Sequence, residues 1–381
     1  MKARLLKFCF NGASQSARNL GIDGFRGLLL VVIAINHLEG ALLTPFTREP
    51  FGAVSAAEAF IFLSGLVAAI VYGRWNDDPA VLKNKVWRRL CTLYAHSLLA
   101  TLVIILLLHL GWLSDIWYQD QDNYFLLQNY LQQPLQAIFM SILQLQQMGY
   151  LDILVAYMLP MVFLPWALLA LQSGRGVWVL VASLSVWMLA QTLTDTVLQS
   201  PYNWLSLDIN IEVGYLDAFA WQLYFYLGVC FGYWQRFNEL QFIRGPIVSF
   251  IVLSFAVIFS IAHHWHWGAA IPWLSAQMSW QDAGLVRVIN TLLLAYCVAW
   301  LIQRRFIFFS IRPLVYLGQH SLQVFTFHAA AIYIFLPWMY KLSEDYHWWQ
   351  DLSLTLFFIL SLFAPAFLHQ RWRERRAVST A

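Results

Sequence analysis

The chain has 381 residues, of which 60% are hydrophobic and only 11% are charged, and its formal net charge is +3. Because soluble domains carry about 25% charged residues, this composition excludes an ordinary soluble protein and predicts a polytopic membrane protein. The basic residues are scattered in short connections rather than gathered in one patch, so we expect no nucleic-acid partner.

Windows of about 20 apolar residues predict ten membrane-spanning helices. The N-terminal tail before the first of them lacks an apolar core, so we expect no cleavable signal peptide. The amphipathic, Gln-rich segment 134–148 is expected to lie at the membrane interface. The predicted spans are 25–43, 54–73, 92–113, 150–171, 176–195, 215–235, 246–263, 284–303, 314–340 and 350–370.

The distribution of basic residues predicts the orientation. With both termini in the cytoplasm, 20 of the 23 Lys and Arg residues lie on the cytoplasmic side, which is the bias that membrane insertion favours. The outer side keeps only Arg48, Arg287 and Lys341. A wrong number of helices would scramble this alternation, so we predict an all-α multi-pass protein with about ten transmembrane helices and both ends in the cytoplasm.

We expect one integral membrane domain over residues 1–381, with cytoplasmic tails at 1–17 and 371–381. The four cysteines lack motif spacing, so no disulfide or cysteine metal site is predicted. The cluster HHWHW at 263–267 has no spaced acidic or Cys partner, and we expect no metal there. A homo-oligomer or a complex with envelope-biosynthesis partners stays open, because lipid-facing and protein-facing surfaces are both apolar.

The first span contains polar groups that hydrocarbon disfavours. In IDGFRGLLLVVIAINHLEG, Asn36, His37 and Glu39 interrupt the apolar run, and an ionisable group near the bilayer centre costs roughly 2.5–3.5 kcal/mol. Eleven steps of about 100° return His37 to nearly the face of Arg26, roughly 16–17 Å along the axis. Histidine suits proton transfer near neutrality. The alternatives are a snorkelling anchor for Arg26 and a helix-packing hydrogen bond for His37.

The second span, SAAEAFIFLSGLVAAIVYGR, places Glu58 in its outer turns and Ser64 near its middle. The short connection at 44–53 makes the first two spans antiparallel neighbours, so Glu58 can lie at a depth similar to that of His37. A carboxylate there could hold the imidazole in one tautomer, as the acid of a catalytic triad does. The alternative is an interfacial glutamate that faces water.

These motifs resemble those of a known family. The sequence IDGFRG…INH is similar to the signature of the membrane acyltransferase family 3, and AEAFIFLSG to its second-helix motif. The fuller run from RNLGIDGFRG to VAAIVYGR resembles the OpgC-type branch, as do the later segments YLDILVAYMLPMVFLP, FAWQLYFYLGVCFG, LVRVINTLLLAY and LVYLGQHSLQVFTFH. The resemblance spans about residues 18–370 and departs from the branch at YLDAFA, where an Asn-Pro is usual.

The resemblance implies a membrane O-acyltransferase of the bacterial inner membrane, in the manner of a glucan O-succinyltransferase. Acyl-CoA (succinyl-CoA or acetyl-CoA) would be its cytoplasmic co-substrate, with no permanently bound cofactor. A hydroxyl of a periplasmic glucan or other envelope saccharide would accept the acyl group. Arg26 could hold a donor phosphate, and His37 would act as general base or as transient acyl carrier, of which we favour the base.

Other polar residues are candidates around this site. Asp152 could orient His37, bind a sugar hydroxyl, or simply stabilise a helix N-terminus. Arg287 could bind the free carboxylate of a succinyl group or form an ion pair with Asp282 or Glu58. The expected donor-binding residues are Arg26, Ser64, His320 and His328, of which the two histidines could instead bridge helices; the expected acceptor- or carboxylate-binding residues are Asp152, Arg287, Trp221 and Gln222.

A competing function is a proton-coupled transporter or flippase for an envelope saccharide or lipid-linked precursor, with the same polar residues along its pathway. That function predicts an inverted repeat with helices broken at matching places, whereas Pro160, Pro165 and Pro337 have no partners at matching offsets. A non-catalytic scaffold is a third alternative. The presence of both Arg26 and His37 speaks against it.

Overall fold

The computed structural model describes residues 19–38, 41–113, 121–204, 215–239, 241, 243, 245–267, 271–304, 306–344 and 347–379. The described chain is built from helices, which confirms the predicted all-α class. The helices are α1 Leu20–Asn36, α2 Thr44–Thr47, α3 Ala56–Tyr72, α4 Pro79–His109, α5 Gln121–Gln132, α6 Pro134–Ile142, α7 Asp152–Gln172, α8 Gly176–Trp204, α9 Ala218–Phe237, α10 Pro246–His264, α11 Pro272–Ala276, α12 Leu285–Gln303, α13 Arg312–Gln319, α14 Ser321–Glu344, α15 Trp348–Ser361 and α16 Phe363–Ser379, with short 3-10 turns η2 Gly73–Trp75 and η4 Ile307–Ser310.

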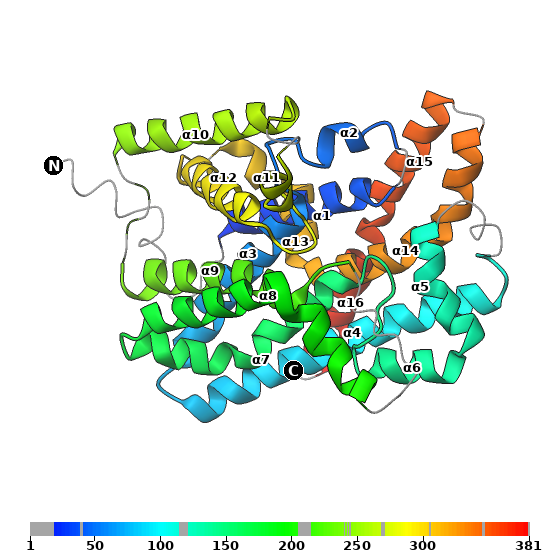
Figure 1. The fold of residues 1–381 in the computed structure, drawn as a ribbon, viewed down its shortest axis with the longest axis horizontal. Helices are drawn as coiled ribbons and strands as arrows, with labels where there is room; N and C mark the ends of the chain where they lie inside the picture. Colours follow the sequence, from blue (N-terminus) through cyan, green and yellow to red (C-terminus); the bar gives the residue numbers. More distant parts are fainter. Residues whose placement is uncertain are drawn as a thin grey trace.

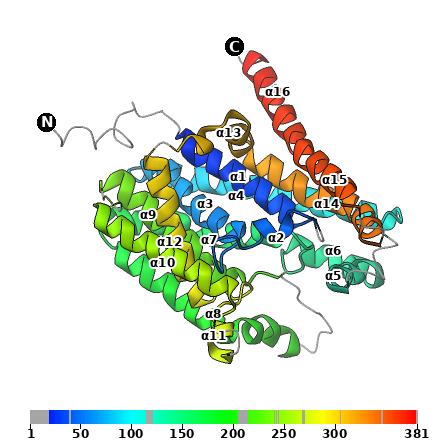
Figure 2. The ribbon, with the colours of Figure 1, turned by 90° about the horizontal axis from the view of Figure 1, so that it is seen from above.

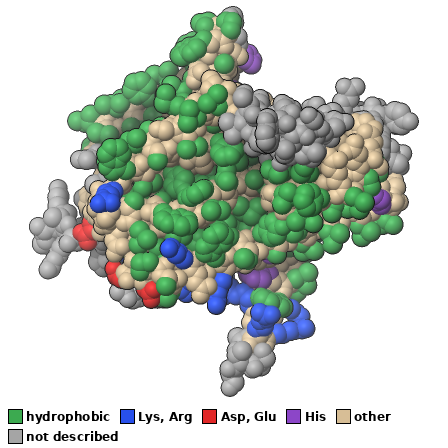
Figure 3. Space-filling view, turned by 60° about the horizontal axis from the view of Figure 1, so that its bottom comes forward, with side chains coloured by type: hydrophobic (Ala, Val, Ile, Leu, Met, Phe, Trp, Pro, Cys, Tyr) green, Lys and Arg blue, Asp and Glu red, His purple; other side chains and the backbone are tan. Residues whose placement is uncertain are grey.

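Eight of the described helices are long and apolar enough to cross a membrane. All ten predicted spans coincide with helices, but the first and the sixth, α1 and α9, are outside this set of eight. Helix α1 has only 17 residues, and α9 is rich in Trp and Tyr. Figure 3 shows hydrophobic side chains over most of one face, as lipid contact requires, while Lys and Arg gather toward one edge around a protruding segment.

The structure adds detail at three places along the predicted helices and the C-terminal tail. The predicted ninth span is two helices, α13 and α14, with His320 at the break between them. The predicted third span begins earlier, because Asp78 accepts hydrogen bonds from the backbone N–H groups of Ala80 and Val81 and caps α4. The predicted tail 371–381 is largely helical, since α16 continues to Ser379.

Helix α1 lies at the centre of the bundle (Figures 1 and 2). In Figure 2, α9, α10 and α12 lie on one side of it and α14 and α15 on the other. Asn19 caps its N-terminus by accepting hydrogen bonds from the N–H groups of Gly21 and Ile22 at 2.9 and 3.3 Å. The helix contacts α3, α13 and α14, and these neighbours surround the polar residues predicted on it.

Glycines bring the central helices unusually close together. A Cβ atom on Gly27 of α1 would lie 1.9 Å from the carbonyl oxygen of Leu314 on α13, and one on Gly65 of α3 would lie 2.0 Å from that of Phe225 on α9. Small residues permit such backbone contact in membrane bundles. The close packing fixes α1 against α13 and α14, and therefore sets the distance between the side chains that face each other across this contact.

Candidate functional site

Arg26 marks the inner end of the site. Its Nη2 donates a hydrogen bond to Ser321 Oγ at 2.7 Å, and its guanidinium lies 5.9 Å from the ring centroid of Phe60. Ser321 is the first residue of α14, next to the break at His320. The contact joins the inner half of α1 to the start of α14, and it leaves the half-buried guanidinium beside the junction of three helices.

His37 marks the outer end of the site and pairs with a second histidine. It caps the C-terminus of α1, and its Nδ1 lies 2.8 Å from Nε2 of His328 on α14. The two rings are stacked with centroids 4.9 Å apart. The same two helices therefore meet twice, once at Arg26 and Ser321 and once at the two imidazoles.

The hydrogen bonds of His328 determine which nitrogen of His37 holds a lone pair. Nδ1 of His328 lies 3.2 Å from the carbonyl oxygen of Phe325, and because a carbonyl only accepts, this nitrogen must donate. Nε2 of a neutral His328 is then an acceptor, so Nδ1–H of His37 donates to it. We infer that Nε2 of His37 carries the lone pair, which is the arrangement that a general base requires.

An aromatic column connects the two ends. The ring of Phe60, which lies under the Arg26 guanidinium, stacks on Phe325 at 6.1 Å, and Phe325 contacts His328 at 5.3 Å. These apolar rings separate a cation at one end from an imidazole pair at the other. The interior between the ends is therefore poor in competing hydrogen-bond partners.

Tyr150 packs on the other side of His37. Its ring centroid lies 4.4 Å from that of His37 and 5.9 Å from that of Tyr333. Tyr150 has φ of 68°, a left-handed conformation that costs a non-glycine residue about 1–2 kcal/mol. A strained residue against a candidate base is typical of a functional site, and the ring of Tyr150 packs against that of His37.

The segment after α1 brings a positive charge to the site. Asn36 donates through Nδ2 to the carbonyl oxygen of Thr47 at 3.2 Å and accepts from Thr47 Oγ1 at 2.6 Å, which fixes helix α2 over the end of α1. Arg48 follows, and its exposed guanidinium lies within electrostatic range of His37. Glu39, which the sequence placed beside His37, lies outside the described residues.

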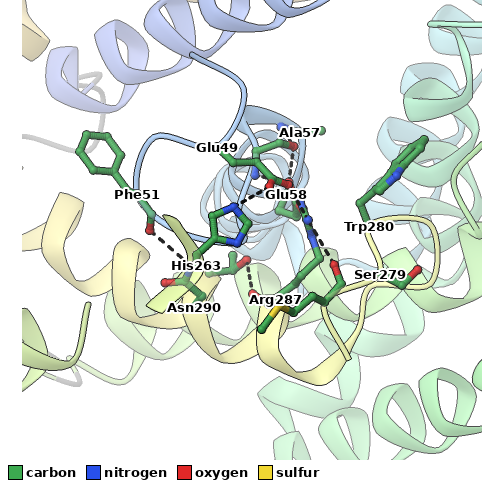
Figure 4. A network of polar contacts seen from close by, with 12 residues as sticks. Glu49, Phe51, Ala57, Glu58, His263, Ser279, Trp280, Arg287 and Asn290 are labelled. Atoms are coloured by element: carbon green, nitrogen blue, oxygen red, sulfur yellow. Dashed lines mark hydrogen bonds and ion pairs between the residues drawn. The ribbon is translucent and has the colours of Figure 1, made fainter. Parts of the chain in front are cut away.

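Glu58 belongs to a separate network, the outer clamp, formed by Glu49, Glu58, His263 and Arg287 (Figure 4). Arg287 donates through Nε to Glu58 Oε1 at 2.8 Å and through Nη1 to Glu49 Oε1 at 2.6 Å. His263 Nε2 lies 3.0 Å from Glu49 Oε2. Glu58 and Arg287 are buried, with 0% and 2% of their surface exposed, so each charge is neutralised inside the protein.

Glu58 also completes the N-terminal cap of α3. Its Oε2 accepts hydrogen bonds from both the backbone N–H and the hydroxyl of Ser55, and Ser55 Oγ accepts from the N–H of Ala57 at 3.2 Å. The pattern Ser-x-x-Glu is a capping box. Glu58 was expected to orient His37, but in the structure it is hydrogen bonded to Ser55 and Arg287. The residue that contacts the imidazole of His37 is His328.

Glu49 is the most accessible member of the clamp. Burial alone would raise the pKa of its carboxyl, but the hydrogen bond from His263 and the charge of Arg287 outweigh burial and hold this pKa below its ordinary value. His264 Nε2 also lies 3.2 Å from the carbonyl oxygen of Pro50. The clamp thus ties the connection between α1 and α3 to α10 and α12, and His264 of HHWHW adds a contact to the same connection outside the clamp.

The expected acceptor-binding residues make contacts within the protein. Asp152 accepts from the backbone N–H groups of Ile153 and Tyr215 at 3.0 and 3.1 Å. Trp221 donates to the carbonyl oxygens of Trp280 and Gln281, and Gln222 exchanges two hydrogen bonds of 2.8 Å with Ser183. Ser64, which was expected to bind the donor, is buried in α3.

His320 has a different environment from His328, although both were expected near the donor. Its Nδ1 lies 2.8 Å from Nδ1 of His369 on α16, and its ring contacts Tyr316 at 5.0 Å. Sequence reasoning missed His369, Tyr150 and the pairing of His37 with His328. A capping box at Ser55 was a readable signal, whereas contacts between distant helices left none in the sequence.

Comparison with known proteins identifies the family of the chain. The family model described as OpgC protein matches residues 18–374, nearly the whole chain. The chain belongs to the OpgC protein family. OpgC membership, together with the apolar helices, indicates a bacterial membrane protein and, in general terms, a glucan-modifying acyltransferase. No curated protein and no solved structure matches the chain.

Proposed function

We propose that this protein transfers an acyl group from cytoplasmic acyl-CoA to a hydroxyl of a periplasmic glucan or related envelope saccharide, with His37 as general base. The observation that carries the proposal is the hydrogen-bond chain from the Phe325 carbonyl through His328 to His37, which leaves a lone pair on His37 Nε2. A base aligned in one tautomer is what removal of a proton from a sugar hydroxyl requires.

The donor is proposed to enter along the column between Arg26 and His37. Arg26 has guanidinium N–H groups suited to phosphate, and its Nη2 donates to Ser321 Oγ at the start of α14. The separation of roughly 16–17 Å along α1 is comparable to the length of a phosphopantetheine arm. With a phosphate at Arg26, the thioester lies near His37.

The proposed reaction has two steps, addition of the acceptor hydroxyl and loss of the CoA thiol. The acceptor hydroxyl gives its proton to His37 Nε2 while its oxygen attacks the thioester carbonyl carbon. The tetrahedral intermediate then collapses, the C–S bond breaks, and the imidazolium returns the proton to the departing CoA thiolate. The alternative, in which Nε2 itself takes the acyl group first, uses the same nitrogen and the same orientation by His328.

For a succinyl donor, we assign the free carboxylate to Arg48 rather than to Arg287. The guanidinium of Arg287 is engaged by two glutamates, so a substrate carboxylate would have to displace one of them. Arg48 is exposed and lies within electrostatic range of His37. Its position beyond the imidazole, as seen from Arg26, suits the distal end of an acyl chain whose thioester is at His37.

The test uses purified protein in detergent, labelled succinyl-CoA and acetyl-CoA, and a periplasmic glucan as acceptor. We expect labelled glucan to form, and Arg48→Ala to reduce succinyl transfer more than acetyl transfer. Equal losses of succinyl and acetyl transfer in Arg48→Ala would refute the carboxylate-binding role of Arg48 and leave the acyltransferase proposal standing. If no acyl group moves from either donor, yet the protein reconstituted in vesicles carries a saccharide across the bilayer, the acyltransferase proposal fails in favour of transport.

A further inference from the structure

Three imidazoles, from α4, the α13–α14 break and α16, gather around the start of α14. His320 at the α13–α14 break and His369 of α16 have their Nδ1 atoms 2.8 Å apart. His96 of α4 lies with its Nδ1 3.0 Å from Thr326 Oγ1 on α14, and it is within electrostatic range of His369. This inner histidine cluster (His96, His320 and His369) has no part in the transfer step proposed above.

Two arginines lie on the same helix faces as members of the inner histidine cluster, because Arg89 is seven residues before His96 on α4 and Arg373 is four residues after His369 on α16. Arg89 of α4 lies within electrostatic range of His96, and Arg373 of α16 within range of His369. Within the described part of the chain, no hydrogen bond or ion pair engages either guanidinium, although Arg89 is half-buried. Two positive charges from different helices near the same imidazoles would attract an anion to this place.

Three neighbouring arginines, Arg88, Arg371 and Arg376, have partners of their own. Arg88 donates through Nε to Asn84 Oδ1 at 3.1 Å. Arg371 lies over the ring of Phe367 at 4.6 Å, and Arg376 over that of Trp372 at 4.0 Å. The nearby carboxylate of Glu374 is engaged by Gln370 at 2.9 Å. Arg89 and Arg373 differ from these three because they lie near the inner histidine cluster and have no hydrogen bond or ion pair among the described residues.

The cluster adjoins the inner end of the candidate site. His320 precedes Ser321, the residue that binds Arg26, so the two groups share the α13–α14 break. Arg89 lies seven residues before His96 on α4, which is two helical turns on the same face, and it precedes the predicted third span. Figure 3 shows Lys and Arg side chains around the segment that protrudes at the bottom of the view, and others to its left.

We propose that Arg89, Arg373 and the inner histidine cluster form a binding site for phosphate esters, occupied by the 3′-phosphoadenosine diphosphate end of the acyl-CoA donor. This inference rests on the proposed function and adds a second contact region for the same donor. Guanidinium groups pair with phosphate oxygens in a forked geometry, and imidazole N–H groups donate to them. A ligand with several phosphates matches cations from two helices better than a lipid headgroup with one phosphate does.

The test is CoA binding to the full-length protein by calorimetry, with Arg89→Gln and Arg373→Gln as variants and Arg88→Gln and Arg371→Gln as matched controls. We expect each test variant to raise the dissociation constant of CoA on the order of tenfold, as loss of a charged hydrogen bond does, and the controls to leave it unchanged. Arg373 is exposed on α16, so its variant keeps the test valid if Arg89→Gln fails to fold.

A second arm uses 3′-dephospho-CoA, which lacks one phosphate. If one of the two arginines binds that phosphate, its variant loses little further affinity for the shortened ligand. Unchanged CoA affinity in both variants, with acyl transfer intact, overturns this inference and leaves the proposed function standing. Unchanged CoA affinity with weaker binding to vesicles of anionic phospholipid assigns the site to a lipid headgroup and also overturns it. If the wild type binds no CoA, the proposed function itself fails.

Discussion

The column between Arg26 and His37 and the outer clamp around Arg287 use similar side chains in opposite ways. In the clamp, one guanidinium is held by two carboxylates that it neutralises. In the column, no carboxylate is hydrogen bonded to either imidazole in the described structure, and the hydrogen bonds of His328 lead us to infer a lone pair on His37 Nε2. Charges that cancel one another support a fold, whereas an aligned lone pair can act on a substrate.

The largest effect on acyl transfer is expected from a substitution of His37. His37→Ala should lower the rate of acyl transfer by roughly 10²–10⁴-fold, because it removes the proposed base, while the protein stays folded since the ring packs at a helix end. The measurement is transfer of labelled acyl groups to glucan, with thermal unfolding in detergent as the control. Full activity of this variant would refute the assignment of His37.

Arg287→Ala should act on folding rather than on the choice of donor. Removing one member of a buried ion pair costs about 3–5 kcal/mol because the partner charge is left without compensation, and Glu58 would be such a charge. We expect a large fall in melting temperature and similar losses of succinyl and acetyl transfer. Partial recovery of stability in the double variant Arg287→Met with Glu58→Gln would support this.

Selective loss of succinyl transfer in Arg287→Ala, at unchanged stability, would contradict the structural role. That result would indicate that Arg287 binds the free carboxylate of the succinyl group, as the sequence first suggested. Arg48 would then not be the residue that binds this carboxylate.

His328 is a positioning residue, and its variants separate orientation from packing. His328→Ala should lower transfer by roughly 10–100-fold, as loss of a partner that orients a histidine does elsewhere. His328→Gln should retain more activity, since a side-chain amide oxygen can accept the hydrogen bond from His37 Nδ1–H. A purely structural role predicts the same loss in both variants and an unchanged pH dependence of the rate.

The smallest effect concerns Glu49. Because folding lowers the pKa of this carboxyl, its contribution to stability is complete above the pKa of the unfolded chain and is lost as pH falls through the lower folded pKa. We expect Glu49→Gln to lower stability by about 1 kcal/mol or less near neutrality and to make no difference well below pH 4.5, the ordinary value. Melting temperatures across that range would check it; a difference that grows toward acid would contradict it.

The sequence predicted the helices better than their contacts. Apolar runs mark a span directly, and the Arg26–His37 spacing follows from helix geometry alone. The partner of His37 could not be read from sequence, because His328 reaches it only through the packing of α1 on α14, beside the close contact of α1 with α13 at Gly27. Glu58 was misleading for a related reason, since a carboxylate at the correct depth binds whichever cation packs beside it, and that cation is Arg287.

The protonation state of His37 tests the account most directly. Nitrogen-15 NMR of histidine-labelled protein, with the His37 signals assigned by their loss in His37→Gln, distinguishes a protonated from an unprotonated ring nitrogen. We predict a neutral ring with its proton on Nδ1 and a lone pair on Nε2, and a loss of this preference in His328→Ala. A proton found on Nε2 of the wild-type protein would contradict the account.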